Sequence, residues 1–93
     1  MFRVSVSCDG ILPTAWPDAL DDVAQEFKSR PWHKIMDCHW DGITLILVAD
    51  NDYDHDGEAL AAEFSDTVAA YASGTPAPGY RVRILSVSLV GAA

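Results

Sequence analysis

The chain has 93 residues, and six basic residues against fourteen acidic ones leave a formal net charge of −8. A chain of this length is expected to form a single domain, residues 1–93, and can bury a core without a metal ion or a disulfide bond. The excess of acidic residues argues against nucleic-acid phosphates and anionic membranes as partners, since both attract positive charge, and it permits a basic protein partner.

No apolar run in the sequence is long enough to cross a membrane, and the first residues alternate between apolar and polar instead of resembling a signal peptide. We therefore predict a cytoplasmic protein. The two cysteines, Cys8 and Cys38, are expected to be buried thiols that do not form a bridge.

The first third of the chain predicts a strand followed by a helix. Residues 2–8 alternate between apolar and polar, which is typical of a half-buried strand. Pro17 suits the first turn of a helix, where its missing N–H costs nothing, and Pro31 ends that helix. Acidic residues gather near the helix start and basic ones near its end, as the helix dipole favours.

A β-hairpin is predicted from residues 32–40 and 43–49, joined by a two-residue Asp41-Gly42 turn of type I′. The second run is apolar on both faces, which favours a central strand, whereas the first alternates and is expected at an edge. Lys34 and Ile35 do not fit this alternation. One face of the first run should carry Trp32, Met36, Cys38 and Trp40, and the other His33, Asp37 and His39.

The last part of the chain predicts a second helix and a fourth strand. The helix is expected to begin at Asp56 or Glu58 and to run to Ser73, with Gly74 as its cap. A loop at 75–79 leads into a strand over 80–90. The apolar residues of this strand change phase near Leu85-Ser86, which indicates a β-bulge. The apolar stripe of the helix consists of Leu60, Phe64, Val68 and Tyr71.

The predicted order, β-α-β-β-α-β, is that of the ferredoxin-like α+β sandwich. We expect a four-stranded antiparallel sheet of order 4-1-3-2 with both helices on one face. The helices should cover Phe2, Val4, Val6, Met36, Cys38, Trp40, Leu45 and Leu47. The other face should stay open and carry Arg3, Ser5, Ser7, His33, Asp37, His39, Thr44, Ile46, Val48, Arg81 and Arg83.

The sharpest motif is the stretch 52–63, which matches the calcium-loop pattern D-x-D-x-D-G-x5-E of the EF-hand. Its context differs from that family, since a strand enters the loop and Ala59 stands where a larger aliphatic residue is usual. The alternative is a strand-to-helix turn whose aspartates cap the helix, and we favour it. The candidate calcium ligands are Asp52, Asp54, Asp56 and Glu63.

The histidines of the first hairpin strand give a weaker metal candidate. Asp37 and His39 would lie about 7 Å apart along the strand, and Cys38 points to the other face. We interpret them as part of a solvated polar face and predict no metal site. The sequence also lacks nucleophile-elbow, P-loop and dinucleotide-binding motifs, so we predict no catalytic residues and no cofactor.

The predicted open face is the strongest candidate for a binding surface. Ile46 and Val48, with Ile35 close by, would form an apolar centre with polar residues and arginines around it, as protein interfaces are commonly built. The alternative is that the C-terminal tail or a loop covers this centre. Stacking aromatics, which RNA-binding sheets of this fold use, are not expected there. The binding residues would be Arg3, His33, Asp37, His39, Ile46, Val48, Arg81 and Arg83.

Three functional hypotheses follow, and the sequence favours binding over catalysis. The first is a small acidic protein-binding module, of the inhibitor or immunity type, that acts on a basic partner such as a nuclease and forms a homodimer through its open face. The second is a small-ligand protein or enzyme with a site between paired sheet faces, formed by His33, His39 and Arg81. The third is a calcium-binding domain.

Overall fold

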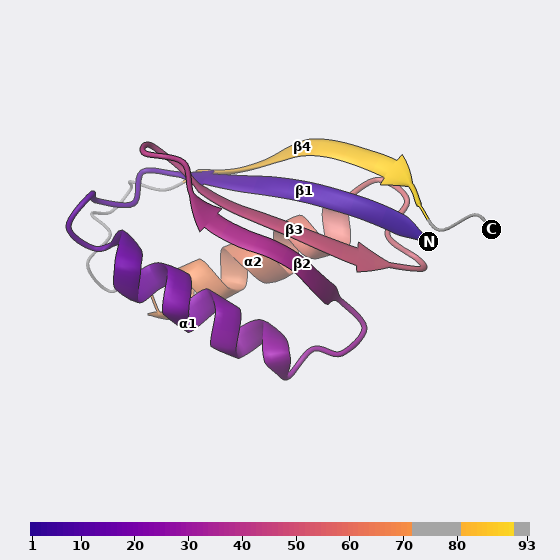
Figure 1. Cartoon of the computed structure of the whole chain (residues 1–93), viewed down its shortest axis with the longest axis horizontal. Helices are drawn as coiled ribbons and strands as arrows, with labels where there is room; N and C mark the ends of the chain where they lie inside the picture. Colours follow the sequence, from indigo (N-terminus) through magenta and orange to yellow (C-terminus); the bar gives the residue numbers. More distant parts are fainter. Residues whose placement is uncertain (72–80, 91–93) are drawn as a thin grey trace.

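The computed structural model describes residues 1–71 and 81–90 and has the predicted order of elements (Figure 1). The predicted cap at Gly74 and the loop at 75–79 lie outside the described residues, as does the side chain of Tyr71. The elements are β1 (Phe2–Asp9), α1 (Trp16–Lys28), β2 (Lys34–Trp40), β3 (Leu45–Asn51), α2 (Glu58–Tyr71) and β4 (Arg81–Leu89).

The four strands form one antiparallel sheet in the order β2-β3-β1-β4. This is the predicted order 4-1-3-2, read from the other edge, and the fold is a ferredoxin-like α+β sandwich. β1 and β3 are central and β2 is at an edge, as predicted. The backbone N–H of Val90 donates to the carbonyl of Met1 at 2.9 Å, so the start of β1 and the end of β4 lie together.

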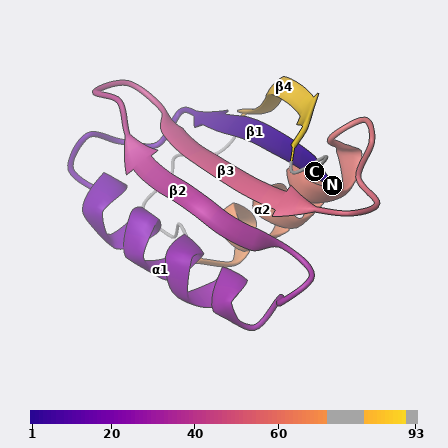
Figure 2. The ribbon, with the colours of Figure 1, turned by 45° about the vertical axis from the view of Figure 1, so that its right-hand side comes forward.

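Both helices pack on one face of the sheet, with α1 alongside β2 and α2 beneath β1 and β4 (Figures 1 and 2). Neither described helix is long and apolar enough to cross a membrane. The core between the layers consists of Val4, Val6, Cys8, Ile11, Ala19, Val23, Phe27, Leu45, Leu47, Ala49, Leu60, Phe64 and Val68.

The cysteines lie on the helix side of the sheet as free thiols, as expected. Cys8 is fully buried, and Cys38 is partly buried against the core. Burial raises the pKa of each thiol from 9.0 to about 11. The thiolate form, which reacts and binds metals, is therefore disfavoured at both positions.

The β2–β3 turn differs from the predicted two-residue turn. Gly42 has a positive φ of +106°, but no residue other than glycine does in the described chain, so the type I′ turn is wrong. Instead the Asp41 carboxylate accepts the backbone N–H groups of Ile43 (2.8 Å) and Thr44 (2.6 Å). These hydrogen bonds lower the pKa of Asp41. The longer turn moves the start of β3 to Leu45.

An unpredicted β-bulge in β2 changes which side chains face the core. The register with β3 shifts between Ile35 and Asp37, so Met36 is the extra residue. Met36 is 44% exposed, and its prediction as a core residue is wrong. Ile35 lies opposite the buried Ala49 and packs on the core in its place. The bulge is the physical reason why Lys34 and Ile35 do not fit the alternation.

The predicted bulge in β4 is confirmed. Ser86 pairs with Ser5 and Ile84 pairs with Val6, which leaves Leu85 as the extra residue. Because the extra residue shifts the alternation of the strand by one position, apolar residues before and after the bulge both face the helices.

Trp40 tests the packing of β2 on the helix layer. Its ring packs against the core and stacks on Trp16, with centroids 5.7 Å apart and planes 6° apart. The change Trp40→Ala should lower the free energy of unfolding by about 2–4 kcal/mol in urea denaturation. Ile43 is 78% exposed, so in the control variant Ile43→Ala the free energy of unfolding should change by less than about 0.5 kcal/mol. A Trp40→Ala variant as stable as the wild type would contradict this packing.

Candidate binding surfaces and the His33 cluster

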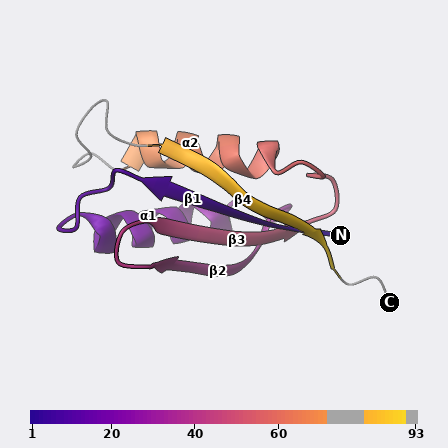
Figure 3. The same cartoon turned by 90° about the horizontal axis from the view of Figure 1, so that it is seen from above.

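The open face is the side of the sheet away from the helices, and no described element covers it (Figure 3). All residues predicted for it as binding residues lie there except His33. Read from β2 to β4, its rows are Lys34-Asp50-Arg3-Ser88, Asp37-Val48-Ser5-Ser86 and His39-Ile46-Ser7-Arg83, with Asp9 opposite Arg81 beyond them.

Two arginines of the open face are paired with carboxylates of the same face. Arg3 makes a two-pronged contact with Asp50, with Nε–Oδ1 at 2.8 Å and Nη2–Oδ2 at 3.0 Å. This contact holds the pKa of Asp50 below its ordinary value. Arg83 Nη2 lies 2.8 Å from Asp9 Oδ2. The charges of this face therefore largely compensate one another.

The centre of the open face is less apolar than predicted. Ile46 and Val48 are only partly exposed, and Ile35, expected beside them, lies on the helix side. At the β2 edge His39 Nδ1 is 2.6 Å from Asp37 Oδ2, and both side chains are about half exposed. The face thus presents a small apolar centre between an Asp–His edge and an arginine edge.

His33 is not on the open face, and its predicted place is wrong. Its backbone N–H donates to the carbonyl of Arg30 at 3.0 Å, so it belongs to the turn after α1 and precedes β2. Its side chain is fully buried against the rings of Phe27, Trp32 and Tyr53, with centroids 5.9 to 6.3 Å away. The alternation of the strand therefore does not apply to this residue.

The hydrogen bonds of Asn51 determine which nitrogen of the His33 ring carries the proton. The Oδ1 atom of Asn51 accepts the backbone N–H groups of Tyr53 (3.1 Å) and Asp54 (2.7 Å). This orients its Nδ2 toward His33 Nδ1 at 3.2 Å. Because an amide nitrogen only donates, Nδ1 accepts, and the ring proton sits on Nε2, which donates to Glu63.

Glu63 joins α2 to the segment that follows α1. Its Oε1 accepts from Arg30 Nε at 3.2 Å, and its Oε2 accepts from Trp32 Nε1 at 3.3 Å and from His33 Nε2. We call His33, Asn51, Tyr53, Trp32 and Glu63 the His33 cluster. With His33 buried, this cluster offers no imidazole to solvent, so its geometry does not favour acid–base catalysis.

The acidic loop, residues 52–57, caps α2. The Asp54 carboxylate accepts from the backbone N–H groups of Ala59 (3.0 Å) and Leu60 (2.9 Å), and Asp56 accepts from Glu58 (3.0 Å). Asp54 is 3% exposed. The loop therefore uses two of the candidate calcium ligands as helix caps, and a third, Glu63, is bound within the His33 cluster. Among the described residues, no three potential ligands gather around one point.

Gly57 has a role that the motif does not explain. Its φ is +80°, and a Cβ there would lie 2.9 Å from Ile84 and 3.2 Å from Val4. The start of α2 thus needs glycine because it approaches β1 and β4 closely.

The charged residues divide unequally between the two sides of the molecule. The open face carries four of the six basic residues and three acidic ones, a net charge near +1. The remaining eleven acidic residues, with Lys28 and Arg30, give the rest of the molecule a net charge near −9. The eleven, which lie on the helices and in the loops and turns, are Asp18, Asp21, Asp22, Glu26, Asp41, Asp52, Asp54, Asp56, Glu58, Glu63 and Asp66.

The sequence interpretation missed the aromatic part of the His33 cluster. It began a strand at Trp32, directly after Pro31, and so left no residues for a turn between helix and strand. A helix-to-strand connection usually needs several residues. The usual length of such a connection could therefore have predicted that Trp32 and His33 lie in a turn.

We compared the chain with models of known protein families, with curated proteins and with solved structures. None of the three comparisons found a match.

For the acidic loop we expect no tight calcium binding, because Asp54, Asp56 and Glu63 already hold backbone groups or side chains. Titration calorimetry at about millimolar calcium should show no saturable heat, and a chelator should leave the melting temperature unchanged. The change Asp54→Ala should destabilise the fold by about 1–2 kcal/mol through loss of the cap. A calcium midpoint in the micromolar range would contradict this reading.

Proposed function

We propose that the chain is a small acidic protein-binding module that binds a basic protein through its helix side. The observation that carries this proposal is the division of charge. The molecule outside the open face has a net charge near −9, and its two helices carry the exposed Asp18, Asp21 and Asp66. Such a surface attracts positively charged partners over a range of about 10 Å at ordinary ionic strength.

An inhibitor or immunity-type role on a basic target, such as a nuclease, is the form of this function that we favour. Both helices pack on the core of the sandwich, so a basic active-site surface could meet their exposed carboxylates without a rearrangement of the fold. Electrostatic complementarity of this kind raises association rates and suppresses wrong partners.

The basic-partner proposal predicts binding of an arginine- and lysine-rich peptide by titration calorimetry, with an affinity that falls as salt rises. The change Asp18→Asn on α1 should weaken binding about two- to fourfold, as expected for one exposed charge. The control Asp37→Asn removes the same charge from the open face and should change the affinity less. If the wild type binds no basic peptide even at low ionic strength, the proposal is wrong.

A second role, self-association through the open face, is favoured by the near-neutral charge of that face. Two copies of a protein with a net charge of −8 repel each other, and the open face is the side on which this repulsion is smallest. Two-fold pairing is the commonest way to cover such a surface. If the two-fold axis of the dimer runs parallel to the strands, Asp37 and His39 of one copy would meet Arg83 of the second copy.

The homodimer predicts that Val48→Asp raises the dimer dissociation constant about 100-fold or more, because a carboxylate would be buried unpaired. Sedimentation velocity measures the change, and far-UV circular dichroism should be unaltered. The control Ile43→Asp adds the same charge in the exposed β2–β3 turn and should leave association unchanged. A wild type that sediments as a monomer at high micromolar concentration would rule the dimer out.

The small-ligand alternative is weakened by the position of His33. A site between paired sheet faces would retain His39 and Arg81, but His33 lies buried on the other side of the sheet. We therefore do not propose a catalytic or small-ligand function for the open face.

A further inference from the structure

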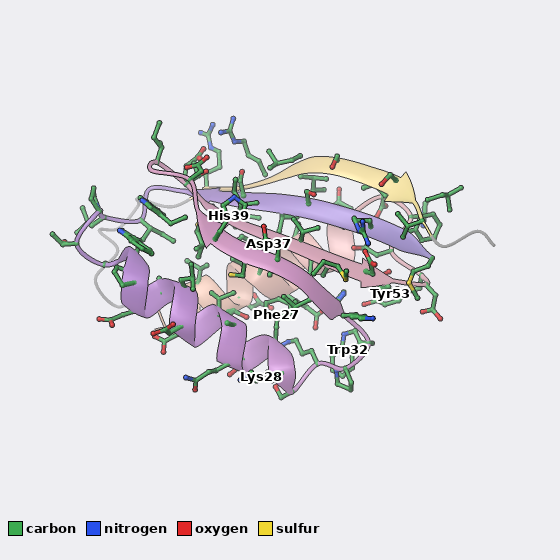
Figure 4. The ribbon with its side chains drawn as sticks, viewed as in Figure 1. Phe27, Lys28, Trp32, Asp37, His39 and Tyr53 are labelled. Carbon is green, nitrogen blue, oxygen red and sulfur yellow. The ribbon has the colours of Figure 1, made fainter. Side chains whose placement is uncertain are left out.

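Trp32 and Tyr53 are large aromatic residues that the fold leaves half exposed, at 49% and 48%. Both lie at the end of the domain where α1 ends and β3 leads into the acidic loop (Figure 4). Neither belongs to the core, where all the other described aromatic side chains lie or against which they pack.

The polar atoms of both residues have partners within the His33 cluster. Trp32 Nε1 donates to Glu63 Oε2 at 3.3 Å, and the Tyr53 hydroxyl lies 3.3 Å from His33 Nε2. Both rings also contact the ring of His33, at centroid distances of 6.3 and 5.9 Å. The exposed parts are therefore ring surfaces whose orientation is fixed before any partner binds, which lowers the entropic cost of binding.

Negative charge surrounds these rings. The pKa of Tyr53 is raised, first by its burial and then by the carboxylates of Glu63, Asp54 and Asp52. The basic groups near them are already paired with carboxylates or lie on the open face, so Arg30 neutralises only part of this charge. Arg30 is bound to Glu26 and Glu63, and Lys34 lies on the open face opposite Asp50.

We propose that Trp32 and Tyr53 form the anchor point for an arginine side chain of the basic protein partner. This inference rests on the proposed binding function and identifies where on the helix side the partner docks. A guanidinium stacks on an aromatic ring, is attracted by its π face and can donate hydrogen bonds to carboxylates at the same time. Lysine offers a compact charge without the planar stacking surface, so arginine fits this surface better.

Nucleic-acid bases also stack on exposed aromatic rings, but the charges oppose them here. A bound strand would bring its phosphates close to Asp52 and Glu63, and phosphate contacts dominate the affinity of such complexes. The acidic surroundings therefore select a cationic protein side chain over a base.

The test follows the Trp32 indole N–H signal by NMR while the wild-type chain is titrated with an arginine-rich peptide and, separately, a lysine-rich peptide of equal length. We expect the Trp32 signal to shift and the arginine peptide to bind more tightly. The change Trp32→Leu should weaken the arginine peptide roughly 5- to 10-fold, the size of a cation–π contact. Trp16→Leu, the same substitution at the other end of α1, is the matched control and should not weaken it.

Each outcome separates this inference from the proposed function. If the wild type binds neither peptide, the basic-partner function fails. If peptides bind but Trp32→Leu binds as well as the wild type, or the Trp32 signal does not move, only the anchor point is wrong. Because the Trp32 signal is measured in the wild type, it tests the anchor point even if a variant does not fold. A Trp32 shift caused by a single-stranded oligonucleotide would also overturn the assignment to arginine.

Discussion

The Glu63 carboxylate is the interaction on which the arrangement of this end of the molecule depends. It leaves the second turn of α2 and accepts hydrogen bonds from Arg30, Trp32 and His33, which all follow α1. One side chain thus connects the two helices and sets the start of β2. The Glu63 side chain is partly buried, and a carboxylate withdrawn from water needs such partners. The same contacts bury His33 and leave the rings of its neighbours facing solvent.

The two sides of the sandwich have different electrostatic character, and this follows from how the strands are paired. On the open face, neighbouring strands place Arg3 beside Asp50 and Arg83 near Asp9, so opposite charges meet. The described helices carry Lys28 as their basic residue, with Arg30 just beyond α1, so acidic residues outnumber basic ones on their side of the sheet. The two interactions that we propose, with a basic partner and with a second copy, would therefore use different residues.

The sequence was sufficient for the architecture because each element carried a local signal. Alternation identified β1, the apolar run identified β3 as central, and the phase change near Leu85 located the bulge in β4. The sequence predictions were wrong where a single inserted or shifted residue determined the face on which a side chain lies. The bulge at Met36 and the turn before Lys34 each reversed the expected face, because strand alternation has a period of two.

What the sequence by itself determined is the order of elements, the sheet topology, the open face and its charged residues, because periodicity and turn residues are local properties. The cap of α2 by Asp54 is a local contact across five residues, and the sequence already favoured it. Only the tertiary structure decided the partners of Glu63 and of His33, because Glu63 binds residues of the α1–β2 turn some thirty positions away. No local pattern encodes such a meeting, so the exposed pair of Trp32 and Tyr53 became visible only after the chain was folded.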